Sequence, residues 1–201
     1  MKTPQGFERP APALLEWAPR IQGPRLVVIG GLSGTGKTTQ ALLLASLLGK
    51  APGAMVLRSD IVRKRLSGVE PTVRLGAEGY TQQMTARVYN AITGVAERTL
   101  RSGQAVVIDA VAARAEERAG FEAAAARAGA PFLGIWLSAP LKLRLRRVTA
   151  RRGDASDADA SVVQAQETFD IGPLTWRVLD AAQAPEYVHG EILADLLASQ
   201  A

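Results

Sequence analysis

A glycine-rich segment carries the clearest chemical signal in this sequence. Residues 31–38 read Gly-Leu-Ser-Gly-Thr-Gly-Lys-Thr and match the pattern G-x-x-x-x-G-K-[ST]. Glycines let backbone N–H groups come close to phosphate oxygens, lysine adds an ammonium, and threonine adds a hydroxyl that can bind Mg²⁺. The residues expected to touch a nucleotide are Gly31, Leu32, Ser33, Gly34, Thr35, Gly36, Lys37, Thr38 and Thr39.

The alternative is a glycine-rich turn that binds nothing. The apolar strand expected before residues 31–38 and the helix expected after them are both required by the pattern, and both are present in the sequence. The helix also points its N-terminal dipole at the loop, which favours an anion there. The sequence therefore predicts a site for a nucleoside triphosphate.

Two aspartates follow apolar segments and could complete such a site. Asp60 comes three residues after a predicted strand and could accept the proton of an acceptor hydroxyl, because an ordinary aspartate is ionised at neutral pH. Its structural alternative is the N-cap of the next helix. Asp109 closes the apolar run Val-Val-Ile and is predicted to hold Mg²⁺ together with Thr38. Its alternative is a turn residue at a strand end.

Arginines gather in a predicted helix over residues 139–152. Arg144, Arg147 and Arg151 are spaced so that they share one helix face. We expect this helix to act as a lid, with Arg147 and Arg151 stabilising the transferring phosphate and Arg152 helping to bind the nucleotide. A solvated helix face is the alternative.

Other polar residues carry weaker signals. Arg58 and Arg63 flank Asp60 and could hold an anionic acceptor. Tyr80, Arg87 and Tyr89 could line an acceptor pocket. Arg118 reads as a surface residue of a helix, and Asp154, Asp157 and Asp159 read as caps of the helix that follows them.

The elements that must position these residues alternate along the chain. Apolar segments at 25–29, 54–57, 105–108, 132–137 and 176–179 read as strands. Helices are expected at 38–48, 60–66, 80–100, 116–128, 139–152, 160–167 and 185–198. The alternation predicts an α/β fold with a parallel sheet and helices on both faces, and a ligand at the carboxyl ends of the strands.

Length and composition limit the classes of function. The 201 residues suit one domain, so we expect an extension at 1–24 and a single domain at 25–201. The chain has no cysteine and one histidine, which excludes disulfides and a multi-histidine metal site. The N-terminus does not read as a signal peptide and no apolar run approaches the roughly 20 residues of a membrane span, so we expect a cytoplasmic protein without membrane contact.

The net charge of +5 raises the question whether the chain binds nucleic acid. No block of lysine and arginine with interleaved aromatic residues occurs in the sequence. A kinase needs cations for its phosphates in any case, so a nucleic-acid surface is possible but not favoured.

Taken together, these pieces resemble a known family. The segment 31–38, Arg-Ser-Asp60, Asp109, Arg147 with Arg151 or Arg152, and Asp-Ala-Ser-Asp157 followed by Gln164 look like the bacterial "predicted kinase" branch of P-loop NTPases, often labelled AAA-family ATPases. This branch is similar to the 5′-kinase domain of polynucleotide kinase, chloramphenicol phosphotransferase, zeta toxins and gluconate kinase. The resemblance runs from about residue 25 to the C-terminus. It implies a five-stranded parallel sheet of order 2-3-1-4-5, Mg-ATP as phosphate donor, Asp60 as the activating residue and an arginine-rich lid.

One position departs from the relatives. Shikimate and gluconate kinases tend to carry an acidic residue two positions before the catalytic aspartate, where this chain has Arg58. Without that acidic residue, binding of Mg²⁺ depends more heavily on Asp109. The positive charge of Arg58 also suggests an anionic acceptor. The sequence thus favours an ATP-dependent kinase acting on a hydroxyl of a small molecule, with a 5′-hydroxyl nucleic-acid kinase or a nucleotide-dependent switch acting on a protein partner as alternatives.

Overall fold

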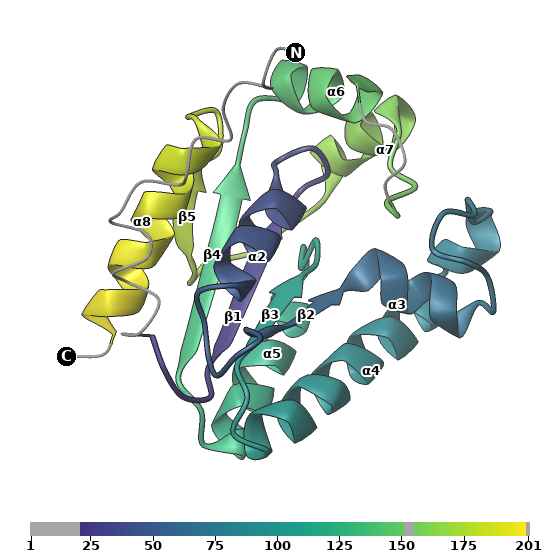
Figure 1. Cartoon of the computed structure of the whole chain (residues 1–201). Coiled ribbons are helices and arrows are strands. Elements are labelled where there is room, and N and C mark those ends of the chain that lie inside the picture. The colour runs from purple at the N-terminus through teal and green to yellow at the C-terminus, as the bar shows by residue number, and fades with distance from the viewer. Residues whose placement is uncertain (1–20, 151–154, 200–201) are drawn as a thin grey trace, which may run out of the picture.

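A parallel sheet forms the centre of the computed structural model, which describes residues 21–150 and 155–199. Its five strands in these ranges are β1 (Leu26–Gly31), β2 (Met55–Arg58), β3 (Val106–Asp109), β4 (Phe132–Ser138) and β5 (Arg177–Asp180). They pair in the order β2-β3-β1-β4-β5, with every pair parallel (Figure 1). The predicted fold class and strand order are confirmed.

Helices cover both faces of the sheet. One face packs against α2 (Lys37–Ala45) and α8 (Pro185–Ala198), and the other against α4 (Gln82–Arg101) and α5 (Ala115–Ala128) (Figure 1). Because both faces are covered, all six residues of β1 are buried. Each of its large apolar side chains contributes roughly 1.5–3 kcal/mol to folding by leaving water.

The remaining elements stand around the carboxyl ends of the strands. On one side lie α3 (Ser59–Leu66) and the 3₁₀ turn η2 (Ala77–Tyr80). On the other lie α6 (Leu141–Ala150), α7 (Ala160–Ala165) and the 3₁₀ turn η3 (Gln166–Thr168) (Figure 1). A ligand at the carboxyl ends of the strands would therefore sit between two sets of elements.

Some predicted boundaries differ from the structure. The long helix begins at Gln82 rather than at residue 80, because Thr81 is its N-cap and accepts a hydrogen bond from the Met84 amide at 3.1 Å. Asp60 lies in the first turn of α3, whose N-cap is Arg58, so its alternative interpretation as an N-cap is wrong. Of the predicted features, residues 1–20 of the extension, Arg151, Arg152 and Asp154 lie outside the described residues.

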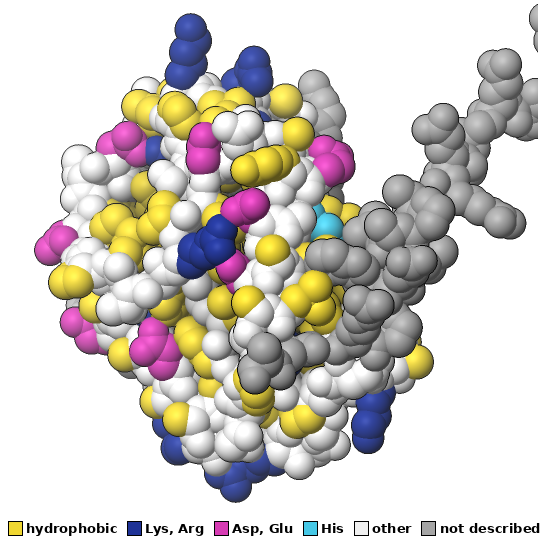
Figure 2. Space-filling view, turned by 90° about the vertical axis from the view of Figure 1, so that its left-hand side faces the viewer, with side chains coloured by type: hydrophobic (Ala, Val, Ile, Leu, Met, Phe, Trp, Pro, Cys, Tyr) yellow, Lys and Arg dark blue, Asp and Glu magenta, His cyan; other side chains and the backbone are white. Residues whose placement is uncertain are grey.

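None of the helices in the described ranges combines the length and the apolar character needed to cross a bilayer. On the face of the molecule shown in Figure 2, lysine and arginine side chains lie apart from one another, interspersed with acidic and apolar ones. That face carries no continuous basic patch.

Candidate active site

The glycine-rich loop joins β1 to α2 and turns tightly. Gly31 and Gly34 have φ angles of 135° and 86°, in the left-handed region that favours glycine. A Cβ at Gly34 would lie 2.7 Å from the backbone oxygen of Arg144, so a side chain there would push α6 away from the loop. The loop is thus fixed by its own glycines and by the close approach of α6.

The predicted lysine and metal ligands lie at the start of α2. Lys37 Nζ donates a hydrogen bond to the Leu32 carbonyl at 3.1 Å, so the ammonium folds back over the loop. Thr38 Oγ1 donates to Asp109 Oδ2 at 2.6 Å. Two oxygens that the sequence assigned to one metal ion, from segments 71 residues apart, therefore lie side by side.

Arg58, the last residue of β2, lies beside Thr38 and Asp109. It stands opposite Asp109 in the register of β2 and β3. Its Nε lies 3.4 Å from Asp109 Oδ2, and its Nη2 donates to Thr38 Oγ1 at 3.4 Å. This arrangement was not expected from the sequence, which assigned Arg58 to an acceptor.

Asp60 lines a cavity of about 1090 Å³ together with Lys37, Thr38 and Asp109. Burial raises the pKa of its carboxyl, and the charge of Asp109 raises it further, while Lys37, a hydrogen bond from Ser156 and Arg58 act in the opposite direction. The net result is a pKa above the ordinary value. A carboxylate in this position has a greater proton affinity than one in water, which suits a general base.

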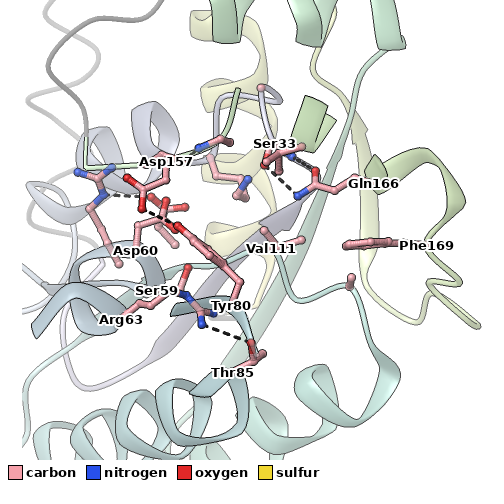
Figure 3. Close-up of a pocket in the computed structure, with 18 of the residues that line it drawn as sticks. Ser33, Ser59, Asp60, Arg63, Tyr80, Thr85, Val111, Asp157, Gln166 and Phe169 are labelled. Atoms are coloured by element: carbon pink, nitrogen blue, oxygen red, sulfur yellow. Dashed lines mark hydrogen bonds and ion pairs between the residues drawn. The ribbon is translucent and has the colours of Figure 1, made fainter. Parts of the chain in front are cut away.

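The far wall of the cavity comes from α3, η2 and α4. Arg63 Nη1 donates to the Gly79 carbonyl at 2.7 Å and to Thr85 Oγ1 at 3.3 Å, and its guanidinium lies 4.9 Å from the centre of the Tyr80 ring (Figure 3). Tyr89 also lines the cavity, whereas Arg87 does not.

The loop after β3 is shaped by residues that the sequence did not single out for this role. The Tyr89 hydroxyl accepts a hydrogen bond from the amide of Ala112, a non-glycine residue with a φ of 50°. Arg118, predicted on the surface, is only 2% exposed and donates to the carbonyls of Ala112, Ala113, Ile171 and Pro173. The surface interpretation is wrong because one guanidinium satisfies two loops that would otherwise bury unpaired carbonyls.

A strap of residues 155–159 lies between α6 and α7 in the chain and contacts the segment from α3 to η2. Asp157 Oδ1 pairs with Lys64 Nζ at 2.7 Å, and Oδ2 accepts from the Tyr80 hydroxyl at 2.7 Å and the Leu75 amide at 3.0 Å (Figure 3). Asp159 caps α7, as predicted, by accepting from the amides of Ser161 and Val162. The prediction of a cap is wrong for Asp157, whose partners lie 77 to 93 positions earlier in the chain.

Gln166 connects η3 to the glycine-rich loop. Its Oε1 accepts from the Ser33 amide at 2.7 Å, and its Nε2 donates to Ser33 Oγ at 3.0 Å (Figure 3). The sequence pointed instead to Gln164, which is exposed. The spacing of Val163 and Gln166 is the available signal: both are buried on the same side of the segment.

The predicted lid arginines separate in the structure. Arg147 Nη1 reaches the Gly34 carbonyl at 3.5 Å and lines a second cavity of about 410 Å³ on the other side of the loop. Arg144 is 2% exposed, donates to the Ala139 carbonyl and pairs with Glu167. Arg144 therefore anchors α6 to Glu167 and the Ala139 carbonyl, and for this arginine the alternative of a solvated helix face is wrong.

The chain is similar to known proteins in sequence and in fold. An uncharacterised protein of Mycobacterium tuberculosis (strain ATCC 25618 / H37Rv) is 34% identical over 157 residues, which cover 74% of this chain and 30% of that protein. The chain thus spans under a third of that relative's length. An adenylyl-sulfate kinase of Myxococcus xanthus (strain DK1622) is 32% identical over 117 residues, covering 58% of this chain and 59% of the kinase.

The fold is similar to that of an APS kinase from Mycobacterium tuberculosis solved in complex with AMPPNP and APS. The TM-score is 0.64 at 25% identity, covering 88% of this chain and 98% of that structure. A family model described as an AAA domain, AAA_33, matches residues 26–169, which include the glycine-rich loop, Asp60, Asp109 and the strap. The chain therefore belongs to the AAA_33 family of P-loop kinases.

Proposed function

We propose that this chain transfers the γ-phosphate of Mg-ATP to a hydroxyl of a small anionic molecule. The observation that carries the proposal is the joint lining of one cavity by Lys37, Thr38, Asp109 and Asp60. Phosphate-binding groups and a carboxylate of raised proton affinity are what a phosphoryl transfer to an alcohol requires.

The nucleotide is held by the loop. Lys37 and the amides of residues 33–38 bind the phosphates, and Arg147 faces the nucleotide from the second cavity, which also borders Gly34 and Gly36. Among the described residues no group of three or more His, Cys, Asp and Glu could hold a metal ion. Thr38 and Asp109 nevertheless fit Mg²⁺, because this ion needs one or two protein oxygens beside phosphates and water. When bound, Mg²⁺ neutralises charge on the phosphates.

The acceptor occupies the part of the cavity between Asp60 and the α3–α4 wall. Arg63, Arg74 and Arg114 line this cavity and would bind a negatively charged group of the acceptor, although acidic residues line the cavity as well. The relative in Myxococcus xanthus is named for such an acceptor, adenylyl sulfate. The exposed ring of Phe169 lies at the opposite end of the same cavity from Asp60 (Figure 3).

In the proposed reaction the acceptor oxygen attacks the γ-phosphorus. The bond from that phosphorus to the oxygen bridging the β- and γ-phosphates breaks, and ADP leaves. Asp60 orients the acceptor hydroxyl and takes its proton. Lys37 stabilises the negative charge that develops on the phosphates. The strap and η3 line the same cavity and would limit the access of water that hydrolyses ATP.

The test is transfer of labelled γ-phosphate from Mg-ATP to a pool of cell metabolites and, separately, to a 5′-hydroxyl oligonucleotide. We expect a labelled small molecule with the wild type, and a loss of at least about 100-fold with Asp60→Asn, the range of general base catalysis. Glu116→Gln removes one exposed carboxylate of α5 outside the cavity and serves as the matched control.

Three outcomes would contradict the proposal. They are full transfer by Asp60→Asn, a label found only on the oligonucleotide, and tight ATP binding without a labelled product in either pool. The last would favour a nucleotide-dependent switch.

A further inference from the structure

Arg58 lies where a metal ion would be expected to act. Its guanidinium approaches both oxygens proposed as metal ligands, Asp109 Oδ2 at 3.4 Å and Thr38 Oγ1 at 3.4 Å. Those two oxygens are themselves 2.6 Å apart. The three groups form one compact cluster at the carboxyl ends of β2 and β3 and the start of α2.

The backbone fixes Arg58 in this place. It is the last residue of β2 and stands opposite Asp109 in the parallel register, so both side chains leave the same edge of the sheet. It is also the N-cap of α3, with an extended backbone at φ −100° and ψ 124°. The side chain is only 15% exposed, so its position is not that of a mobile surface arginine.

The charges explain why a cation is needed there. Asp109 is 8% exposed at its side chain, and its charge is close enough to raise the pKa of Asp60. A buried carboxylate without a counter-charge is costly. Arginine stays protonated at all relevant pH values, so Arg58 supplies a permanent positive charge to this pair of carboxylates and to any phosphate above Thr38.

We propose that the Arg58 guanidinium serves as a built-in counter-cation for the nucleotide phosphates and takes over part of the role of the metal in binding. Nucleotide affinity then depends only weakly on Mg²⁺. A metal ion and the guanidinium compete for Thr38 Oγ1 and Asp109 Oδ2, so bound Mg²⁺ takes the place of Arg58 beside these oxygens and the guanidinium matters most for metal-free nucleotide. The inference rests on the proposed nucleotide site and is independent of the acceptor.

Calorimetric titration with ATP, once in excess Mg²⁺ and once in EDTA, tests the inference. Wild type is expected to bind in both conditions. Arg58→Met should weaken binding of metal-free ATP by about 10- to 100-fold, the range for one lost charge-assisted hydrogen bond, while changing Mg-ATP binding by less than about threefold. Arg65→Met removes the same charge from an exposed position of α3 outside the cavity and is the control.

Arg58→Gln provides a second variant, because it removes the charge while keeping a polar side chain with two N–H donors. It should also lose affinity for metal-free ATP selectively, and its Mg-ATP binding would show that the fold is intact. Equal losses in both conditions, or the same selective loss with Arg65→Met, would overturn the inference.

The wild type separates this inference from the proposed function. A wild type that binds Mg-ATP but not metal-free ATP contradicts only the role of Arg58. A wild type that binds no ATP even with Mg²⁺ contradicts the proposed function itself.

Discussion

The Gln166 side chain fixes the third position of the glycine-rich loop through both ends of its amide. Its oxygen accepts from the Ser33 amide and its nitrogen donates to the Ser33 hydroxyl, with Gln166 only 6% exposed. Gln166→Glu keeps the first bond, loses the second donor and adds a negative charge beside the phosphates. We expect Mg-ATP affinity to fall about tenfold or more, or about 1.4 kcal/mol, measured by calorimetry.

The matched control for this change lies two residues earlier. Gln164→Glu introduces the same charge at an exposed position of α7 and should leave the affinity within about twofold. If both variants lose affinity equally, the effect is general electrostatics and Gln166 does not position the loop.

Sequence could identify residues whose chemistry depends on local spacing. Gly31 to Thr38 form a continuous pattern, and Asp109 ends an apolar strand, so both could be predicted to meet at one edge of a parallel sheet. Gln166 and Arg118 could not, because their partners are set by tertiary packing; Ser33 is 133 positions away from Gln166. A polar residue in a helical segment looks the same whether it faces water or a distant loop.

At the scale of elements, the strap and α3 are joined by a buried ion pair. Lys64 is 1% exposed and Asp157 is 7% exposed at their side chains. Removing one partner leaves a buried charge without compensation, so Asp157→Asn should lower the free energy of unfolding by about 3 kcal/mol. Urea denaturation measures this change.

A double variant distinguishes the ion pair from simple packing. Lys64→Met with Asp157→Leu removes both charges and should recover much of the lost stability, because apolar pairs of similar volume can replace buried ion pairs. A double variant no more stable than Asp157→Asn would count against the ion pair as the cause.

The same carboxylate predicts a dependence of stability on pH. Burial alone would raise the pKa of Asp157, but hydrogen bonds from Lys64, the Leu75 amide and Tyr80 bring it below the ordinary value. Its contribution is therefore fully present above the unfolded-state pKa of about 3.9 and is lost as pH falls below it.

The stability difference between wild type and Asp157→Asn, followed by urea denaturation, should accordingly be constant near neutral pH and shrink below about pH 4. A difference that stays constant through the acid range would show that Asp157 is not the group responsible.

Element types were predictable where periodicity is strong, and element ends were not. Helix periodicity placed Tyr80 in the long helix, yet Tyr80 belongs to η2, where its hydroxyl can reach Asp157. Thr81 is the N-cap of α4, and the contact of Tyr80 with Asp157, which holds Tyr80 outside the helix, could not be read from the sequence. Tertiary contacts thus decided a boundary that local propensity left undefined.

At the scale of the whole molecule, strand alternation alone was enough to predict the parallel sheet, and from the sheet the edge at which a ligand is expected. The strand order came from family resemblance, because short apolar strands carry no information about which neighbour they pair with. The cavity could not be predicted either, since its walls come from α3, α4, the loop after β3, the strap and η3. Each of these segments is placed by contacts with the others.

Because these segments hold one another in place around the cavity, a bound nucleotide is expected to raise the Tm of the whole chain. A ligand that binds only the folded chain at about 100 times its Kd adds about 2.7 kcal/mol to the free energy of unfolding. For a chain of 201 residues this corresponds to a rise in Tm of roughly 5–11 °C. Mg-ATP should produce that rise in the wild type, measured by differential scanning calorimetry.

Lys37→Met removes the ammonium that folds over the loop and should abolish most of the rise, while leaving the Tm of the free protein nearly unchanged, because Lys37 is only partly buried. Because stabilisation by binding reports on the whole cooperative unit, a single shifted transition would also show that the α3 side and the α6 side of the cavity unfold together. An equal shift in Lys37→Met would mean that the nucleotide binds elsewhere. Two transitions, of which only one responds to Mg-ATP, would mean that the two sides are stabilised separately.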